Sequence, residues 1–215
     1  MTEYLLDTPP HAIGVVVFSH GSGSGRHSPR NQFVAAELRK AGLATLLLDL
    51  LTPAEDRNYE NRFDIALLSE RLGQAVEHVR RQAATRALPV GLFGASTGAA
   101  SALRVAAEMP QAVAAVVSRG GRPDLAGGAV LPRVKAPTLL IVGGLDHEVL
   151  ELNRAARAAL TGCESELAIV PGATHLFEEP GTLEAVARLA ARWFRQAALR
   201  SFGTETAGSE TDGSE

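Results

Sequence analysis

The chain has 215 residues, of which 46% are hydrophobic and 21% are charged, and its formal net charge is −3. This length and hydrophobicity allow one well-buried α/β domain and leave little room for two. With a slightly acidic balance and no basic run, the sequence gives no indication of nucleic-acid binding.

The ends of the chain and its single cysteine set further limits. The amino terminus lacks the basic-then-apolar layout of a secretory signal, and no apolar run is long enough to span a bilayer. We therefore expect a cytoplasmic protein without a membrane partner. Cys163 is the only cysteine, which excludes an internal disulfide and a multi-thiolate metal site. Residues 201–215 contain four acidic and no basic residues, and we expect them to form a disordered acidic tail after a single domain at residues 1–200.

Short apolar runs alternate with amphipathic stretches along the chain. Residues 1–12 have no clear pattern, and a short strand at residues 4–6 is one interpretation. The predicted strands are residues 13–18, 44–50, 90–94, 114–118, 138–143 and 166–170, and the predicted helices are residues 29–41, 64–84, 97–108, 148–160 and 182–199. Asp64 suits the start of the second helix, and Gly42 suits the end of the first. Continuous apolar strands between helices are typical of a doubly wound, mostly parallel sheet, here of about six strands.

Gly94-Ala95-Ser96-Thr97-Gly98 lies between the third predicted strand and the third predicted helix. A G-x-S-x-G sequence in this context is typical of a nucleophile elbow. The strand-to-helix turn forces the serine into a strained backbone conformation, and the glycines on either side remove side chains that would collide. The alternative is a glycine-rich packing turn, because the pentapeptide also occurs by chance.

Asp146 follows the fifth predicted strand, and His175 follows the sixth. Ser96, Asp146 and His175 therefore have the chain order of an α/β-hydrolase triad. A serine hydroxyl needs a histidine to take its proton and a carboxylate to orient that histidine. Asp124, after the fourth strand, is an alternative acid, and a surface position is the alternative for His175. We expect His147 to be an exposed loop residue.

The first predicted strand is followed by a glycine-rich loop, residues 20–25. It lacks the lysine of a P-loop and the spacing of a dinucleotide fingerprint, so we interpret it as an oxyanion loop. One N–H donor would come from Thr97 and the second from Ser22, with the adjacent glycines as alternatives. His20 would fix the loop and not act as a base.

With these residues in place, the chain resembles a compact α/β-hydrolase of the dienelactone-hydrolase-like kind over about residues 13–199. The motifs that carry the resemblance are His20-Gly21, Gly94-x-Ser96-x-Gly98, Gly144-x-Asp146 and Gly172-x-x-His175. The resemblance implies a strand order of 2-1-3-4-5-6 and hydrolysis of an ester, lactone, thioester or amide through an acyl-enzyme, without metal or organic cofactor. Two features depart from it: dienelactone hydrolase itself uses a cysteine nucleophile where this chain has Ser96, and the first two strands of the full superfamily sheet are missing or reduced.

The expected activity is that of a serine esterase acting on small soluble substrates. Only about fifty residues separate Ser96 from Asp146, which leaves no room for a lid domain and predicts a shallow, open site. An acyltransferase or perhydrolase with the same triad is one alternative, and a non-catalytic binding module is another. A homodimer is possible.

Four arginines follow strand ends near this predicted site: Arg26, Arg30, Arg119 and Arg122. If Arg26 and Arg119 face the pocket, their planar guanidinium groups could hold a substrate carboxylate or phosphate. Surface pairing with Asp124 or Glu178 is the alternative.

Overall fold

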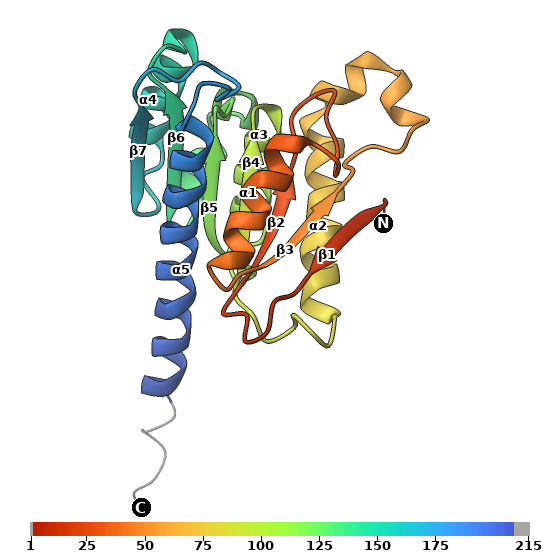
Figure 1. Ribbon diagram of the computed structural model, residues 1–215, viewed down its shortest axis with the longest axis vertical. Coiled ribbons are helices and arrows are strands. Elements are labelled where there is room, and N and C mark those ends of the chain that lie inside the picture. Colours follow the sequence, from red (N-terminus) through yellow and green to blue (C-terminus); the bar gives the residue numbers. More distant parts are fainter. Residues whose placement is uncertain (1, 209–215) are drawn as a thin grey trace, which may run out of the picture.

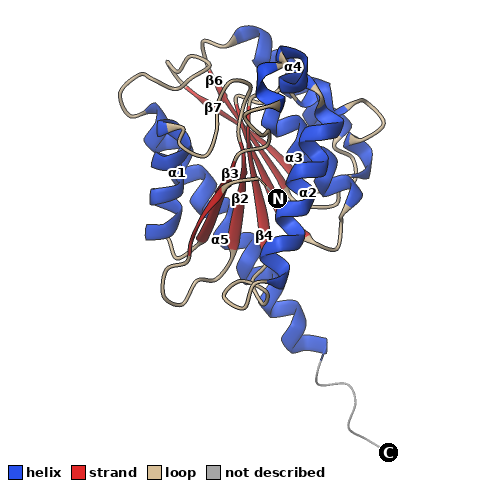
Figure 2. Ribbon diagram, turned by 90° about the vertical axis from the view of Figure 1, so that its right-hand side faces the viewer, coloured by secondary structure: helices blue, strands red, loops and turns tan. Residues whose placement is uncertain are grey.

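The computed structural model describes residues 2–208, which form one open sheet between two layers of helices (Figures 1 and 2). The strands are β1 (Tyr4–Asp7), β2 (Val15–Ser19), β3 (Ala44–Leu48), β4 (Val90–Ala95), β5 (Val113–Arg119), β6 (Thr138–Gly143) and β7 (Ser165–Val170). The helices are α1 (Pro29–Lys40), α2 (Ile65–Arg81), α3 (Thr97–Glu108), α4 (His147–Ala159) and α5 (Thr182–Gly208).

The seven strands lie in the order β1-β3-β2-β4-β5-β6-β7. The six predicted strands are parallel and in the predicted order, so the doubly wound α/β-hydrolase fold is confirmed. The predicted number of about six is one too low, because β1 pairs antiparallel with β3 at the sheet edge. Since β1 has only four residues and is mostly exposed, it lacks the buried apolar run that marks the other strands.

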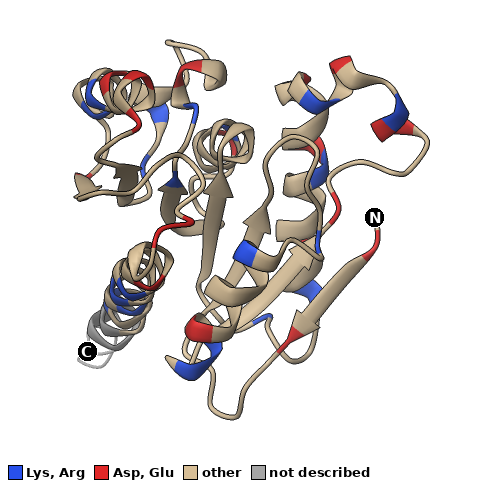
Figure 3. Cartoon of the chain, turned by 45° about the horizontal axis from the view of Figure 1, so that its top comes forward, with Lys and Arg blue, Asp and Glu red and all other residues tan. Residues whose placement is uncertain are grey.

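Side chains of the central strands alternate between the two helical layers. In β2, Val15 and Val17 pack with α2 and α3, whereas Val16 and Phe18 pack with α1 and α5. Burial on both faces explains why these strands read as continuous apolar runs in the sequence. Charged residues of both signs lie on the helices and loops around the sheet (Figure 3).

The predicted helix ends are also found. The Asp64 side chain accepts a hydrogen bond from the N–H of Leu67 at 3.0 Å and so caps α2. Helix α1 ends just before Gly42, whose φ of +82° is a left-handed conformation that favours glycine.

Helix α5 is longer than predicted and continues to Gly208, into the segment expected to be a tail. The remainder of that segment, residues 209–215, lies outside the described residues. Within residues 2–208, none of the helices, α5 included, combines the length and the apolar character that crossing a bilayer requires.

Helix α5 packs closely on β4 through a glycine. A Cβ added to Gly91 would lie 2.6 Å from two ring carbons of Phe194, which is too close for the ring to stay in place. This contact holds α5 against β4, the strand that leads to Ser96.

Replacing Gly91 with alanine is therefore expected to lower the free energy of unfolding by about 1–3 kcal/mol, because the Phe194 ring must move. The measurement is the urea midpoint and slope of unfolding. Gly128→Ala is the matched control, since a Cβ there meets nothing within 4 Å and Gly128 has no positive φ. Equal stability of the two variants would contradict the tight packing of α5 on β4.

Candidate active site

Ser96 is the single residue between β4 and α3, and its backbone is strained, with φ 51° and ψ −122°. A Cβ on Gly94 would lie 2.5 Å from Cα of Ala99, and a Cβ on Gly98 would lie 2.2 Å from the carbonyl oxygen of Ser19. No side chain fits at either position. The strand-to-helix turn therefore has the geometry expected of a nucleophile elbow, with Ser96 half-buried at the carboxyl edge of the sheet.

His175 and Asp146 are paired. The distance from His175 Nδ1 to Asp146 Oδ2 is 2.6 Å, and the Asp146 side chain is mostly buried. Asp124, the alternative acid, is instead bound by both Nε and Nη2 of Arg122, at 2.9 and 2.7 Å. The carboxylate of Asp146 thus fixes the ring of His175 and leaves Nε2 as the nitrogen available for proton transfer. His147 is exposed at the first position of α4, as expected.

The end of β5 lies between Ser96 and His175. The N–H of Ser96 donates to the carbonyl oxygen of Arg119 at 3.2 Å. The next residue, Gly120, lies against the imidazole, since a Cβ there would be 3.5 Å from both Cε1 and Nδ1 of His175. Among residues 2–208, no hydrogen bond joins Ser96 Oγ to His175. In hydrolases without bound substrate such contacts are often long.

The glycine-rich loop after β2 lies directly on Ser96. A Cβ on Gly21 would be 3.1 Å from Cβ of Ser96. Ser22 and Thr97 line the same small hollow, together with the apolar side chains of Leu51 and Leu68. The two residues predicted to donate to an oxyanion are therefore brought to one place beside the serine.

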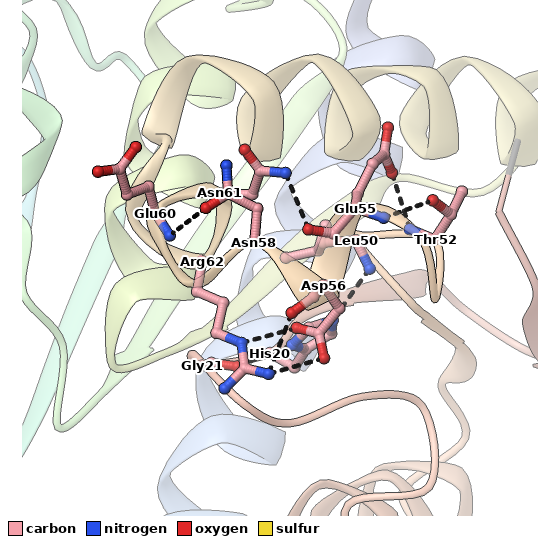
Figure 4. A network of polar contacts seen from close by, with 10 residues as sticks. All are labelled: His20, Gly21, Leu50, Thr52, Glu55, Asp56, Asn58, Glu60, Asn61 and Arg62. Atoms are coloured by element: carbon pink, nitrogen blue, oxygen red, sulfur yellow. Dashed lines mark hydrogen bonds and ion pairs between the residues drawn. The ribbon is translucent and has the colours of Figure 1, made fainter.

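His20 is buried beneath this loop and bonded at both ring nitrogens (Figure 4). Its Nδ1 lies 2.8 Å from the carbonyl oxygen of Gly21, and its Nε2 accepts from the N–H of Leu50 at 2.9 Å. Because Nε2 accepts, Nδ1 carries the proton and donates. Burial lowers the pKa of His20 below its ordinary value of 6.5. His20 is thus a neutral residue that fixes the loop, as the sequence predicted.

A polar segment after β3, with short 3-10 helices at Glu55–Arg57 and Tyr59–Phe63, forms the other wall of the hollow (Figure 4). Arg62 binds the Asp56 carboxylate through Nε at 2.8 Å and Nη2 at 2.9 Å. Its Nη1 lies 3.5 Å from the position of a Cβ on Gly23. Sequence reasoning missed Asp56 and Arg62, because this segment has no apolar periodicity and its only signal is a polar run between a strand and a helix.

The structure corrects the hypothesis that Arg26 and Arg119 together hold a substrate anion. The guanidinium of Arg26 forms ion pairs with Asp49 and Glu3, so its charge is already neutralised. Arg119 is only 7% exposed, and its Nε and Nη1 atoms have no hydrogen-bond partner. The predicted surface pairs form through the other two arginines, Arg30 with Glu178 and Arg122 with Asp124.

The single cysteine is not part of this site. Cys163 lies in the connection before β7, and burial raises the pKa of its thiol. Among the side chains described, those of residues 2–202, no group of three or more His, Cys, Asp or Glu residues is arranged to hold a metal ion.

Comparison with known proteins decides the family. The model of the dienelactone hydrolase family matches residues 3–205. The chain belongs to the dienelactone hydrolase family. The crystal structure of a dienelactone hydrolase from Anabaena variabilis is 54% identical, with a TM-score of 0.87 and 90% of both chains covered. This chain therefore has the α/β-hydrolase fold of that family.

More distant solved structures agree with the fold. Est1E from Butyrivibrio proteoclasticus is 16% identical, with a TM-score of 0.76 over 90% of this chain and 93% of that one.

Two curated relatives, from two strains of Mycobacterium tuberculosis, carry the name "Putative phosphoribosyl transferase" and are 60% identical over 189 residues. That match spans 88% of this dienelactone hydrolase family member but only 42% of the relatives' length.

The buried, neutral His20 predicts a pH dependence of stability. Its pKa is lowered on folding, so below pH 6.5 the unfolded chain binds a proton there that the folded chain does not. The free energy of unfolding should fall as pH drops from about 7.5 to about 5, and His20→Gln should reduce that fall. His27→Gln, which changes an exposed histidine between β2 and α1, is the control for urea unfolding at each pH. An unchanged pH dependence in His20→Gln would mean that His20 does not titrate with unfolding.

Proposed function

We propose that this protein is a serine hydrolase that cleaves carboxylic esters, lactones or thioesters of small soluble substrates. The observation that carries the proposal is the strained backbone of Ser96 beside the His175–Asp146 pair, with the end of β5 in contact with both. A packing turn would need neither a strained serine nor an oriented histidine at the adjacent strand end.

In the proposed reaction, Ser96 Oγ attacks the acyl carbonyl carbon while His175 Nε2 takes the hydroxyl proton. The negative charge on the carbonyl oxygen is stabilised by the N–H groups of Ser22 and Thr97. The bond to the leaving oxygen then breaks, and His175 returns the proton to that oxygen. Water, deprotonated by His175, attacks the acyl-enzyme and releases the acid and Ser96. Asp146 keeps the imidazole oriented and stabilises its positive form.

The surroundings of Ser96 favour small substrates. The hollow between the glycine-rich loop, Leu51 and Leu68 has a volume of only about 10 Å³, which is the space that one water molecule occupies. Within residues 2–208 no inserted domain lies between Ser96 and Asp146, where the chain forms only α3, β5, β6 and two short 3-10 helices. A long acyl chain would find no covered apolar channel in this arrangement.

The name of the M. tuberculosis relatives is compatible with this proposal, because the match covers less than half of their length. The matched segment is 42% of each relative and covers 88% of this chain, a member of the dienelactone hydrolase family. We assign a phosphoribosyl transferase activity, if those relatives have one, to the part of their sequence outside the match. Acyl transfer to an alcohol or peroxide is the second candidate activity for this chain, because it would use the same acyl-enzyme. Analysis of the products formed with added alcohol or peroxide distinguishes acyl transfer from hydrolysis.

A fluorophosphonate probe tests for an activated serine. Wild type and Ser165→Ala are expected to gain the mass of one adduct, and Ser96→Ala is expected to gain none, as read by intact mass spectrometry. Ser165 lies on β7, away from the hollow, and controls for the loss of a serine hydroxyl. No adduct on folded wild type would overturn the proposed nucleophile.

Two aspartates provide a matched test of the acid. Asp146→Asn should lower kcat for p-nitrophenyl acetate by about 10³–10⁴-fold, because the imidazole loses the carboxylate that orients it and stabilises its positive form. Asp124→Asn should leave kcat close to that of wild type, since Asp124 binds Arg122. The assignment of Asp146 fails if the two variants lose activity to the same extent.

A further inference from the structure

Arg119 ends β5 with a buried guanidinium that nothing neutralises. Its Nε and Nη1 atoms have neither a hydrogen-bond partner nor contact with solvent, and no carboxylate within residues 2–202, the part of the chain whose side chains are described, forms an ion pair with it. Burial of a charged group without a partner is costly, so such groups are normally paired or kept for a ligand. The other arginines named in the site, Arg26, Arg62 and Arg122, are each held by a carboxylate.

A second guanidinium, that of Arg30, lies close to Arg119 instead of a counter-charge. Burial and, second, the positive charge of Arg30 lower the pKa of Arg119 to about 10. Arg30 lies in the first turn of α1 and binds Glu178 only through Nη1, at 3.2 Å, in a pair that is exposed on the Glu178 side. Its Nε is buried without a partner. The pair with Glu178 therefore leaves Nε of Arg30, and Nε and Nη1 of Arg119, without a partner.

The backbone of Arg119 contacts the proposed nucleophile. The carbonyl oxygen of Arg119 accepts the N–H of Ser96, and Gly120 lies against the ring of His175. In β5, Ala115 and Val117 pack into the layer of α1 and α5. Because side chains alternate along a strand, Arg119 points into that same layer, toward the amino-terminal end of α1. The positive end of the α1 dipole adds to the two guanidinium charges.

We propose that Arg119 and Arg30 form a subsite beside Ser96 that holds a phosphate group carried by the substrate. Two guanidinium forks at a helix amino terminus suit a group with three oxygens and up to two negative charges. A substrate carboxylate would bring only one negative charge. The side chain of Glu178, which pairs with Arg30, does not neutralise Arg119. This inference rests on the proposed function, because it names the substrate class of the same site.

Binding of inorganic phosphate tests the subsite without any substrate. In thermal unfolding, phosphate should raise the melting temperature of wild type and of Arg154→Met but not of Arg119→Met, and acetate at equal ionic strength should raise none. Arg154 is an exposed arginine on α4 that pairs with Glu151, which makes it a matched control. Arg30→Met should lose the phosphate effect as well, so the test stands if Arg119→Met does not fold. Equal shifts in all variants, or an acetate effect as large as that of phosphate, would overturn the subsite.

Kinetics then link the subsite to catalysis. The substrates are p-nitrophenyl acetate and the p-nitrophenyl ester of 3-phosphonopropanoic acid. Arg119→Met should lower kcat/KM for the phosphonate ester about 100-fold more than it lowers kcat/KM for the acetate ester, because charge-assisted hydrogen bonds to the phosphonate are lost. An equal loss on both esters would mean that Arg119 only supports the fold. If wild type binds phosphate but cleaves neither ester, the esterase proposal fails and the anion site stands.

Discussion

The site depends on how closely two backbones approach at the end of β4. The strand turns into α3 through one residue, and the space beside that turn is filled by backbone atoms of Ala99 and Ser19. Only hydrogen fits at Gly94 and Gly98, and this close packing over-determines the strained conformation of Ser96. The glycine-rich loop is positioned by the same contact, since Gly21 lies against Ser96. A change in this packing would move the serine and the loop together.

The burial of each ionisable side chain in the site, and the group to which it is bonded, decide the role that the side chain can have. His20 and His175 both follow strands at the carboxyl edge of the sheet, yet His20 is buried and bonded to two backbone groups, whereas His175 is partly exposed and bonded to a carboxylate. The first environment favours the neutral ring. The second orients the ring of His175, which suits the role in proton transfer that we propose for it. The arginines divide in the same way: Arg26 and Arg62 are paired, and Arg119 is buried without a counter-charge.

The local sequence pattern was sufficient to predict most of the fold. The parallel strands are long enough and buried enough on both faces to read as apolar runs, and the helix ends at Asp64 and Gly42 have local causes, a capping side chain and a positive φ. The pattern was insufficient for β1, which is short and exposed, and for the polar segment that carries Asp56 and Arg62. Neither has a periodic apolar face, so their structure depends on pairing with distant residues.

The sequence by itself determined the α/β class and the three residues proposed as a triad, because both follow from pattern and spacing along the chain. The strand order was what the family resemblance implied. Only the tertiary structure decided that His175 pairs with Asp146 and not with Asp124, that Arg26 is held by Asp49 and Glu3, and that Arg119 is left buried beside Arg30. The physical reason is that ion pairs and desolvation depend on distances of a few ångströms between side chains far apart in sequence. Periodicity records which face of an element is buried, but it does not record which charges meet there.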